Sequence, residues 1–196
     1  MIINNEIVTI GICCFNAEKE ILDAINSAFN QTWKNKQILV IDDCSTDHSY
    51  EVIKNSKYIN DIELFRNKKN RGPAFSRNQI VKKAKGSFIC FFDDDDKSHK
   101  KRVFYQLESI FKAGYPKNKY VISTCGIKRE YPNGYCLKLI AMGLNGAMPK
   151  DSQLANYLLF SQKVKGTDFG FCSPTCSMML TKNCFDEAGL FDTSLR

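Results

Sequence analysis

Short apolar runs alternate with amphipathic segments along the first half of the chain. Four runs have the length and bulk of buried strands, at residues 7–13, 37–41, 62–65 and 88–92. Apolar residues recur at helical spacing at about residues 16–29, 45–53, 73–84 and 101–112. We expect helices there, the first capped by Asn16 and the second by Ser45 or Thr46. This alternation predicts an α/β fold with a mostly parallel central sheet flanked by helices.

The second half of the chain has a mixed pattern. The runs 127–131 and 135–139 flank Pro132-Asn133-Gly134, which predicts a hairpin. Further strands are expected at 120–125 and 175–180, short helices at 152–160 and 182–188, and a mobile stretch at 141–149. We expect one domain over residues 1–196, with an α/β half of about 1–113 and a mixed, incomplete half of about 114–196.

Composition narrows the class of protein. The 196 residues are 43% hydrophobic and 25% charged, which is ordinary for a globular domain. No apolar stretch of about 18 residues predicts a transmembrane helix, and the N-terminus lacks the pattern of a secretory signal. We therefore expect a cytoplasmic location. The net charge of +7 favours phosphate-bearing ligands or peripheral association with the inner face of a membrane. No nucleic-acid motif accompanies this charge, so no nucleic acid is expected as a partner.

Nine cysteines are many for a chain of this length, but their pattern carries little chemistry. Most lie inside apolar runs, and no Cys-x-x-Cys pair is present. Cys172, Cys176 and Cys184 make a weak zinc possibility, and both histidines are remote from them in the sequence. Buried, reduced thiols are the favoured explanation.

Four consecutive aspartates, Asp93 to Asp96, follow directly after the apolar run 88–92. Adjacent carboxylates repel one another and are costly to desolvate unless a cation lies among them. Hard divalent ions such as Mg²⁺ or Mn²⁺ prefer carboxylate oxygens. The alternative is a solvated acidic turn that caps the next helix.

Other polar motifs converge on the same edge of the predicted sheet. The second strand ends in Asp42-Asp43, and the first ends in Cys13-Cys14-Phe15-Asn16. The third helix opens with a segment, residues 70–78, that contains Arg77. Because ligands of open α/β sheets bind at the carboxyl ends of strands, these segments predict one crevice with carboxylates and an arginine suited to phosphate.

Taken in order, these motifs resemble those of family 2 glycosyltransferases of the GT-A fold. The matching segments are Cys13-Cys14-Phe15-Asn16, Asn30-Gln31-Thr32, Ile41 to Asp47, Asn70-Arg71-Gly72 with Ser76-Arg77-Asn78, and the Asp-x-Asp motif Asp93-Asp94-Asp95. They cover about the first 100 residues. The resemblance implies an inverting transferase that moves a sugar from a nucleoside-diphosphate donor, with UDP expected, to a glycan or lipid-linked acceptor.

The resemblance also implies roles for individual residues. Asp43 would accept a hydrogen bond from the uracil ring, and the segment from Cys13 to Phe15 would form the walls of the base pocket. Arg77 would lie near the base and diphosphate, and Asp93 near the donor ribose and sugar. Asp95 would bind Mn²⁺ or Mg²⁺ directly, and the ion would stabilise the departing nucleoside diphosphate.

Some positions depart from the family pattern. Cys13 and Cys14 replace the usual threonine and its neighbour, and Cys44 replaces a glycine. Asp94, usually serine or alanine, is counted among the nucleotide-sugar-binding residues without a role of its own. Asp96 is expected to support or cap the next helix. His99 has a structural role in the favoured interpretation, with metal binding as the alternative.

The expected catalytic base is missing from the sequence. Residues 188–192 resemble a family turn that is followed soon afterwards by a Glu-Asp pair with the general base, whereas the sequence stops at Arg196. The candidates Asp151, Asp168, Asp186, Glu187 and Asp192 are better explained as caps or surface charges. We expect a truncated form that binds donor but lacks most turnover.

Three alternatives remain at this point. A phosphohydrolase of the haloacid dehalogenase type also places Asp-x-Asp after a strand, but Lys97 occupies the position where that class has Thr or Val. A sugar-nucleotide pyrophosphorylase would begin with a glycine-rich loop, which Gly11 alone does not supply. A non-catalytic nucleotide-sugar-binding fragment is the third.

Overall fold

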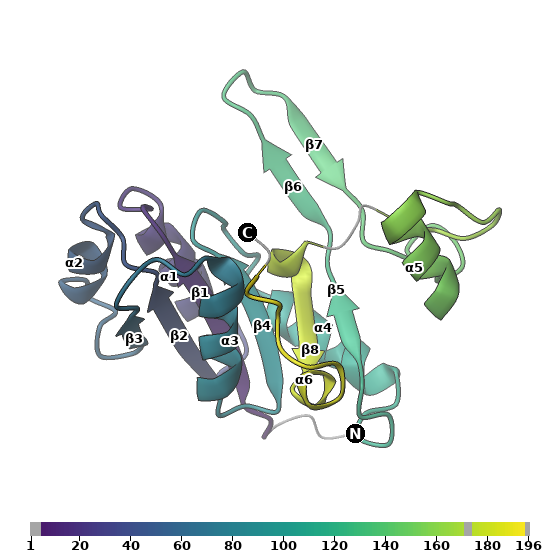
Figure 1. The fold of residues 1–196 in the computed structure, drawn as a ribbon, viewed down its shortest axis with the longest axis horizontal. Helices are drawn as coiled ribbons and strands as arrows, with labels where there is room; N and C mark the ends of the chain where they lie inside the picture. The colour runs from purple at the N-terminus through teal and green to yellow at the C-terminus, as the bar shows by residue number, and fades with distance from the viewer. Residues whose placement is uncertain (1–4, 171–173, 195–196) are drawn as a thin grey trace. The chain divides into compact units, whose positions relative to one another are not determined.

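The computed structural model describes residues 5–170 and 174–194, and it has an α/β fold (Figure 1). The strands are β1 Val8–Cys14, β2 Lys36–Asp42, β3 Glu63–Arg66, β4 Phe88–Asp93, β5 Ile122–Thr124, β6 Ile127–Glu130, β7 Cys136–Leu139 and β8 Met178–Thr181. The helices are α1 Ile21–Phe29, α2 Ser49–Lys54, α3 Pro73–Lys83, α4 Arg102–Lys112, α5 Asp151–Phe160 and α6 Asn183–Ala188, with a 3-10 turn at Thr175–Ser177.

The central sheet has six strands in the order β3-β2-β1-β4-β8-β5. The strands β3, β2, β1 and β4 are parallel, and β8 joins β4 in antiparallel orientation. The predicted mostly parallel sheet is therefore confirmed. The strands β6 and β7 form the predicted hairpin as a separate two-stranded sheet.

The pleat of β1 sends alternate side chains to opposite faces of the sheet. Val8, Ile10, Ile12 and Cys14 are fully buried in the main core, together with apolar residues of α1 and α4. On the opposite face, Gly11 meets Ile80 of α3. The sheet is thus covered on both faces, as expected for parallel strands that are apolar on both sides.

The chain divides into two compact units. The first contains Met1–Ser123 and Met179–Arg196, and the second contains Thr124–Met178. The first unit holds the parallel strands, and the second holds the hairpin and α5. The assignment of one domain to the whole chain stays a prediction. None of the helices within residues 5–170 and 174–194 has the length and apolar character needed to cross a bilayer.

The predicted caps of α1 and α2 are wrong. The helix α1 begins at Ile21, and the side chain of Asn16 instead accepts the N–H of Thr46 at 2.8 Å. The helix α2 begins at Ser49, whose N–H donates to Asp47 at 3.0 Å rather than to Ser45 or Thr46. The physical reason is that these polar side chains join the loops after β1 and β2, where Asn16 accepts the N–H of Thr46 and Ser45 accepts the N–H of Asn16.

The aspartate run also does not cap a helix. The helix α4 begins at Arg102, six residues after Asp96, and Lys101 precedes it. The N–H of Asp96 donates to the carbonyl of Asp93 at 3.4 Å, so the run forms a turn directly after β4. The predicted capping role of Asp96 is therefore wrong, because the chain continues through residues 97–101 before the helix starts.

Gly11 sets how closely α3 approaches the sheet. A Cβ atom at this position would meet Cγ2 of Ile80 and lie 2.8 Å from its Cδ1. Both residues are buried, so neither has room to move. The glycine therefore permits the packing that carries the side chains of α3 over the end of β1.

We predict that Gly11→Ala destabilises the protein by about 1–3 kcal/mol through overpacking. Ile80→Ala alone is expected to cost about 2–5 kcal/mol because it leaves a cavity. The double variant should cost less than the sum, since the new methyl group fills part of that cavity. Chemical denaturation of the unsubstituted protein, the two single variants and the double variant measures these free energies of unfolding. Val103→Ala, on the opposite face, is the control and should add to Gly11→Ala; additive costs for Gly11 and Ile80 would contradict the packing.

Candidate active site

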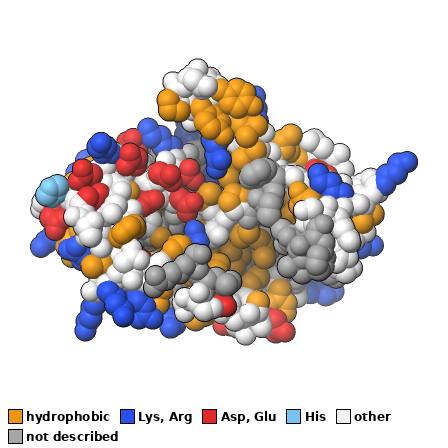
Figure 2. Space-filling view, turned by 45° about the horizontal axis from the view of Figure 1, so that its top comes forward, with side chains coloured by type: hydrophobic (Ala, Val, Ile, Leu, Met, Phe, Trp, Pro, Cys, Tyr) orange, Lys and Arg blue, Asp and Glu red, His pale blue; other side chains and the backbone are white. Residues whose placement is uncertain are grey.

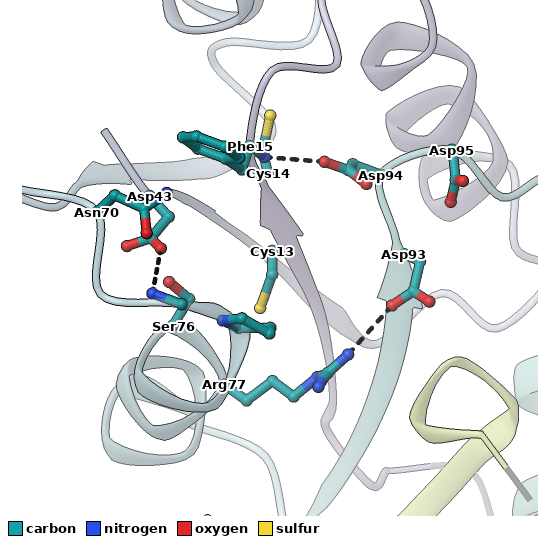
Figure 3. A pocket seen from close by; sticks show the side chains of 12 residues that line it. Cys13, Cys14, Phe15, Asp43, Asn70, Ser76, Arg77, Asp93, Asp94 and Asp95 are labelled. Carbon is teal, nitrogen blue, oxygen red and sulfur yellow. Dashed lines mark hydrogen bonds and ion pairs between the residues drawn. The ribbon is translucent and has the colours of Figure 1, made fainter. Parts of the chain in front are cut away.

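A cleft of about 480 Å³ opens at the carboxyl ends of β1, β2 and β4, inside the first unit (Figure 3). The residues lining it are Cys13, Cys14, Phe15, Asp43, Asn70, Gly72, Pro73, Ser76, Arg77, Asp93, Asp94 and Asp95. Every predicted donor-binding and metal-binding residue lies in this set. Figure 2 shows acidic side chains gathered on this side of the molecule. The strand order brings the segments together, because parallel strands all end at one edge.

Asp43 lies at the base of the cleft and is 4% exposed. Its carboxylate accepts the N–H of Gly72 at 2.7 Å, the N–H of Arg71 at 3.0 and 3.1 Å, and the amide of Asn67 at 2.6 Å. A buried carboxylate requires such donors, because burial without them is costly. Asp43 therefore anchors the loop that precedes α3.

Asn67 is a residue that the sequence analysis missed. Its amide nitrogen donates both to Asp43 and to the hydroxyl of Ser76, at 2.6 and 3.0 Å. It thus joins the loop after β3 to the first turn of α3. The available signal was its position as the first residue after β3, at the same sheet edge as the other polar motifs.

The three carboxylates of Asp93, Asp94 and Asp95 have different partners (Figure 3). Asp93 pairs with the guanidinium of Arg77 at 3.5 Å across the cleft. Asp94 accepts the N–H of Phe15 at 2.9 Å. Within the described part of the chain, no hydrogen-bond donor reaches the carboxylate of Asp95, which is exposed to solvent. Asp95 is therefore the carboxylate that is free to take a new partner.

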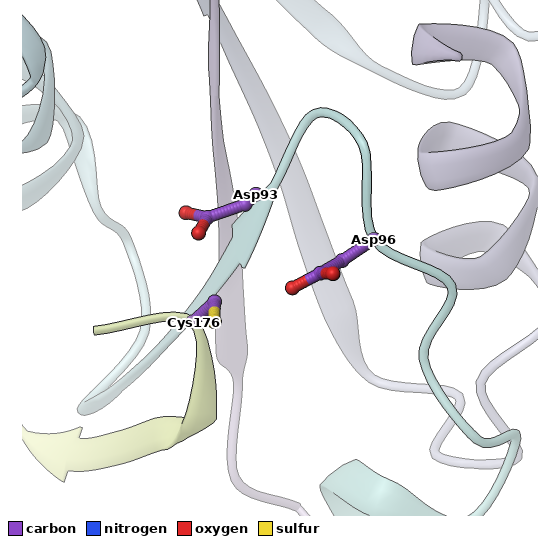
Figure 4. A group of neighbouring side chains, drawn as sticks. All are labelled: Asp93, Asp96 and Cys176. Carbon is purple, nitrogen blue, oxygen red and sulfur yellow. The ribbon is translucent and has the colours of Figure 1, made fainter. Parts of the chain in front are cut away.

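Asp96 lies across the turn from Asp93. Carboxylate oxygens of these two residues are within 4.8 Å of each other, and both side chains project from the same turn (Figure 4). Asp96 is not among the residues that line the cleft. Its negative charge therefore adds to the acidic potential beside the cleft, but its side chain is not part of the cleft wall.

Comparison with known proteins identifies the family. The model of glycosyl transferase family 2 matches residues 9–184. The chain belongs to this family. An uncharacterized glycosyltransferase of Rickettsia conorii is 32% identical over 143 residues, which are 73% of this chain and 23% of that protein. An Escherichia coli protein named UDP-Glc:alpha-D-GlcNAc-diphosphoundecaprenol beta-1,3-glucosyltransferase is 38% identical over 91 residues, or 46% of this chain and 36% of that protein.

Solved structures show the same GT-A fold. The crystal structure of Staphylococcus aureus TarS 1-349 has a TM-score of 0.65 and 23% identity, covering 96% of this chain and 51% of that one. Its complex with UDP-GlcNAc has a TM-score of 0.63 and 20% identity, covering 94% and 48%. A Pyrobaculum calidifontis mannosyltransferase in complex with GDP-Man and Mn²⁺ has a TM-score of 0.53 and 18% identity, covering 64% and 36%.

The family 2 chain spans only 19–38% of the length of the two relatives named here and of three further curated glycosyltransferases that it matches. The activity, substrates and partners of the whole protein are therefore matters of proposal. The binding roles of the cleft residues also stay predictions, although the structure brings all of them together. Cys172 lies outside the described residues, so the weak zinc possibility is not tested.

The family 2 chain carries thiols in the wall of its cleft. Burial raises the pKa of Cys13 to about 12. The positive charge of Arg77 opposes this rise, and the negative charge of Asp93 adds to it. Burial likewise raises the pKa of Cys14 to about 12, and the negative charge of Asp94 adds to the effect. Both thiols are therefore neutral at physiological pH, with Cys13 partly exposed at the cleft and Cys14 buried in the main core.

Burial also raises the pKa of Asp94, and its two acidic neighbours add to the effect, whereas the hydrogen bond from Phe15 opposes it. The charged form of Asp94 is thus less favourable than that of an ordinary aspartate.

The turn after β2 contains a strained backbone conformation. Cys44 has a φ of 63°, in the left-handed region where glycine is favoured.

We predict that the thiols of Cys13 and Cys14 resist alkylation. A rise in pKa from 9.0 to about 12 lowers the thiolate fraction at pH 8 by about a thousandfold. The raised pKa keeps both thiols largely protonated up to about pH 10–11. Iodoacetamide labelling at pH 8 with peptide mass spectrometry should modify the exposed Cys136 first. Unfolding in guanidinium should equalise the rates, whereas equal rates in the folded protein would contradict the assignment.

We predict that Cys44→Gly stabilises the protein by about 0.5–1 kcal/mol, because glycine adopts a positive φ without steric cost. The melting temperature should rise by about 2–4 °C in thermal unfolding. Cys44→Ala removes the thiol but keeps a Cβ atom, so it is the matched control and should not stabilise. A gain of the same size for alanine would show that the thiol, rather than the backbone, carries the strain.

Proposed function

We propose that this chain forms the donor-binding part of an inverting glycosyltransferase that uses a nucleoside-diphosphate sugar, with UDP as the expected nucleotide. The observation that carries the proposal is the cleft, which has a recessed carboxylate at one end and the Asp93–Asp95 turn at the other. Arg77 lies between them. Family membership supports transfer chemistry and argues against the phosphohydrolase and pyrophosphorylase alternatives.

The end of the cleft at Asp43 is suited to the planar, hydrogen-bonding ring of a nucleotide base. Phe15 is 44% exposed and supplies an apolar surface at the cleft wall. Asp43 is held by three N–H donors, and the N–H of Arg71 is shared between both carboxylate oxygens, so a further N–H can take over one of these two shared contacts. We infer that Asp43 accepts the ring N–H of uracil, and that Cys13 and Phe15 pack beside the ring.

The other end of the cleft has the charges that a metal-bound diphosphate requires. Arg77 supplies a guanidinium for phosphate oxygens, and its pairing with Asp93 keeps it oriented into the cleft. When an anionic donor enters, Arg77 can exchange Asp93 for phosphate. Asp93 is proposed to lie beside the ribose and sugar of the donor.

The residues present fit a divalent cation. The side chain of Asp95 is exposed at the cleft and has no hydrogen-bond donor among the described residues, and Asp93 lies two positions before it. Oxygen ligands of this kind suit Mn²⁺ or Mg²⁺. We propose that Asp95 holds the ion directly. When bound, the ion would neutralise the charge that develops on the departing nucleoside diphosphate.

The acceptor is proposed to be a glycan or a lipid-linked sugar. The support is the Escherichia coli relative, whose name gives a diphosphoundecaprenol-linked sugar as its acceptor. Peripheral membrane association would bring the chain to such an acceptor, and the net charge of +7 favours an anionic surface.

No described residue is assigned as the general base. The carboxylate of Asp168 accepts the N–H groups of Asn145 and Gly170, each at 2.8 Å. Asp192 accepts both the N–H and the hydroxyl of Ser194. Asp168 thus joins two segments of the chain, and Asp192 holds a local turn, so both acids already have structural partners. A non-catalytic donor-binding fragment stays the alternative, and a base located after Arg196 stays a prediction.

We predict that UDP raises the melting temperature in the presence of Mn²⁺ and that a phosphate monoester does not. Asp95→Asn should weaken Mn²⁺-dependent UDP binding by about 10- to 100-fold or more, because the neutral amide is a poor ligand for a hard cation. Calorimetry measures the affinity. Asp61→Asn, an exposed acid remote from the cleft, is the control and should bind normally. Unchanged Mn²⁺ dependence in Asp95→Asn would refute the assignment.

A further inference from the structure

Asp94 is the member of the aspartate run for which the family resemblance offers no role. It follows β4 directly, and the ladder between β1 and β4 ends with the pair Cys13 and Asp93. Side chains alternate along a strand, so Asp93 points toward Arg77 whereas Asp94 points toward Phe15 (Figure 3). The two neighbouring carboxylates therefore serve different parts of the cleft.

The hydrogen bond of Asp94 replaces a missing backbone partner. Phe15 is the first residue after β1, where the ladder with β4 has ended. Its N–H donates to Oδ2 of Asp94 at 2.9 Å. The next residue, Asn16, has a φ of 54°, and its N–H donates to the hydroxyl of Ser45 at 3.0 Å. Phe15 is thus fixed from the β4 side by Asp94 and from the β2 side through its neighbour.

The carboxylate of Asp94 carries a cost that a neutral side chain would avoid. It is partly buried, and like charges flank it on both sides. What it supplies in return is a charge-assisted acceptor for the N–H of Phe15. The ring of Phe15 is 44% exposed and lines the cleft, so the position of this backbone determines where one wall of the cleft lies.

We propose that Asp94 is a positioning residue that fixes Phe15 as the wall of the nucleotide-base pocket, rather than a ligand of the metal ion. This proposal rests on the proposed donor-binding function. It links the two ends of the cleft, because the turn that carries Asp93 and Asp95 also holds the wall at the base end.

Two variants separate the hydrogen bond from the charge. Asp94→Ala and Asp94→Asn both remove the negative charge beside Asp93 and Asp95, but only asparagine keeps an oxygen acceptor for Phe15. We predict that Asp94→Ala binds UDP with Mn²⁺ about tenfold more weakly than Asp94→Asn does. Inorganic pyrophosphate with Mn²⁺ contains no base, so calorimetry should give equal affinities for it in the two variants.

Hydrogen exchange of the Phe15 amide, followed by NMR, reports the contact without any ligand. Protection should persist in Asp94→Asn and be lost in Asp94→Ala, while the other amides of β1 stay protected and show that the variants fold. Equal UDP affinities in the two variants would overturn the proposal, and so would pyrophosphate binding that is also about tenfold weaker in Asp94→Ala than in Asp94→Asn. If the unsubstituted chain binds neither ligand, the donor function and the base-wall role both fail, whereas the exchange result still decides whether the contact exists.

Discussion

The buried carboxylate of Asp43 connects more of the cleft than any other single group described above. It lies directly after β2 and accepts hydrogen bonds from Asn67, Arg71 and Gly72. These donors belong to the loop between β3 and α3, so one charge joins a strand, a loop and the start of a helix. A buried carboxylate without donors would cost several kcal/mol, on the order of the total stability of a small domain. The loop therefore adopts the conformation that supplies these donors. This conformation sets where α3 begins, and the start of α3 sets the positions of Ser76 and Arg77.

The pleat of the parallel strands decides which side chains share a face of the sheet. Gly11 lets α3 approach on one face, while Ile10 and Ile12 pack on the other face against the main core. The same alternation separates Asp93, which pairs with Arg77 of α3, from Asp94, which meets the backbone of Phe15. Two adjacent residues of one chemical type thereby have different neighbours. Residue type alone is a poor guide to role in such a run.

Four consecutive carboxylates are tolerated because each has a different environment. Asp93 has a guanidinium partner, Asp94 has a backbone N–H, and Asp96 lies outside the cleft lining. Asp95 remains exposed and without a donor among the described residues, which makes it the residue whose charge a cation would compensate. The proposed donor brings both negative phosphate and a positive metal ion, so Arg77 and the carboxylates would each gain a partner.

The sequence by itself determined the order of strands and helices, the hairpin, and the convergence of Cys13, Asp43, Arg77 and the aspartate run on one sheet edge. Apolar spacing and strand order are local properties, and parallel strands place their carboxyl ends together. The sequence did not determine the start of α1, the role of Asn67 or the partner of Asp94. Only the tertiary structure decided these. Each depends on hydrogen bonds between residues far apart in the chain, such as Phe15 with Asp94, and strand register and pleat select those partners.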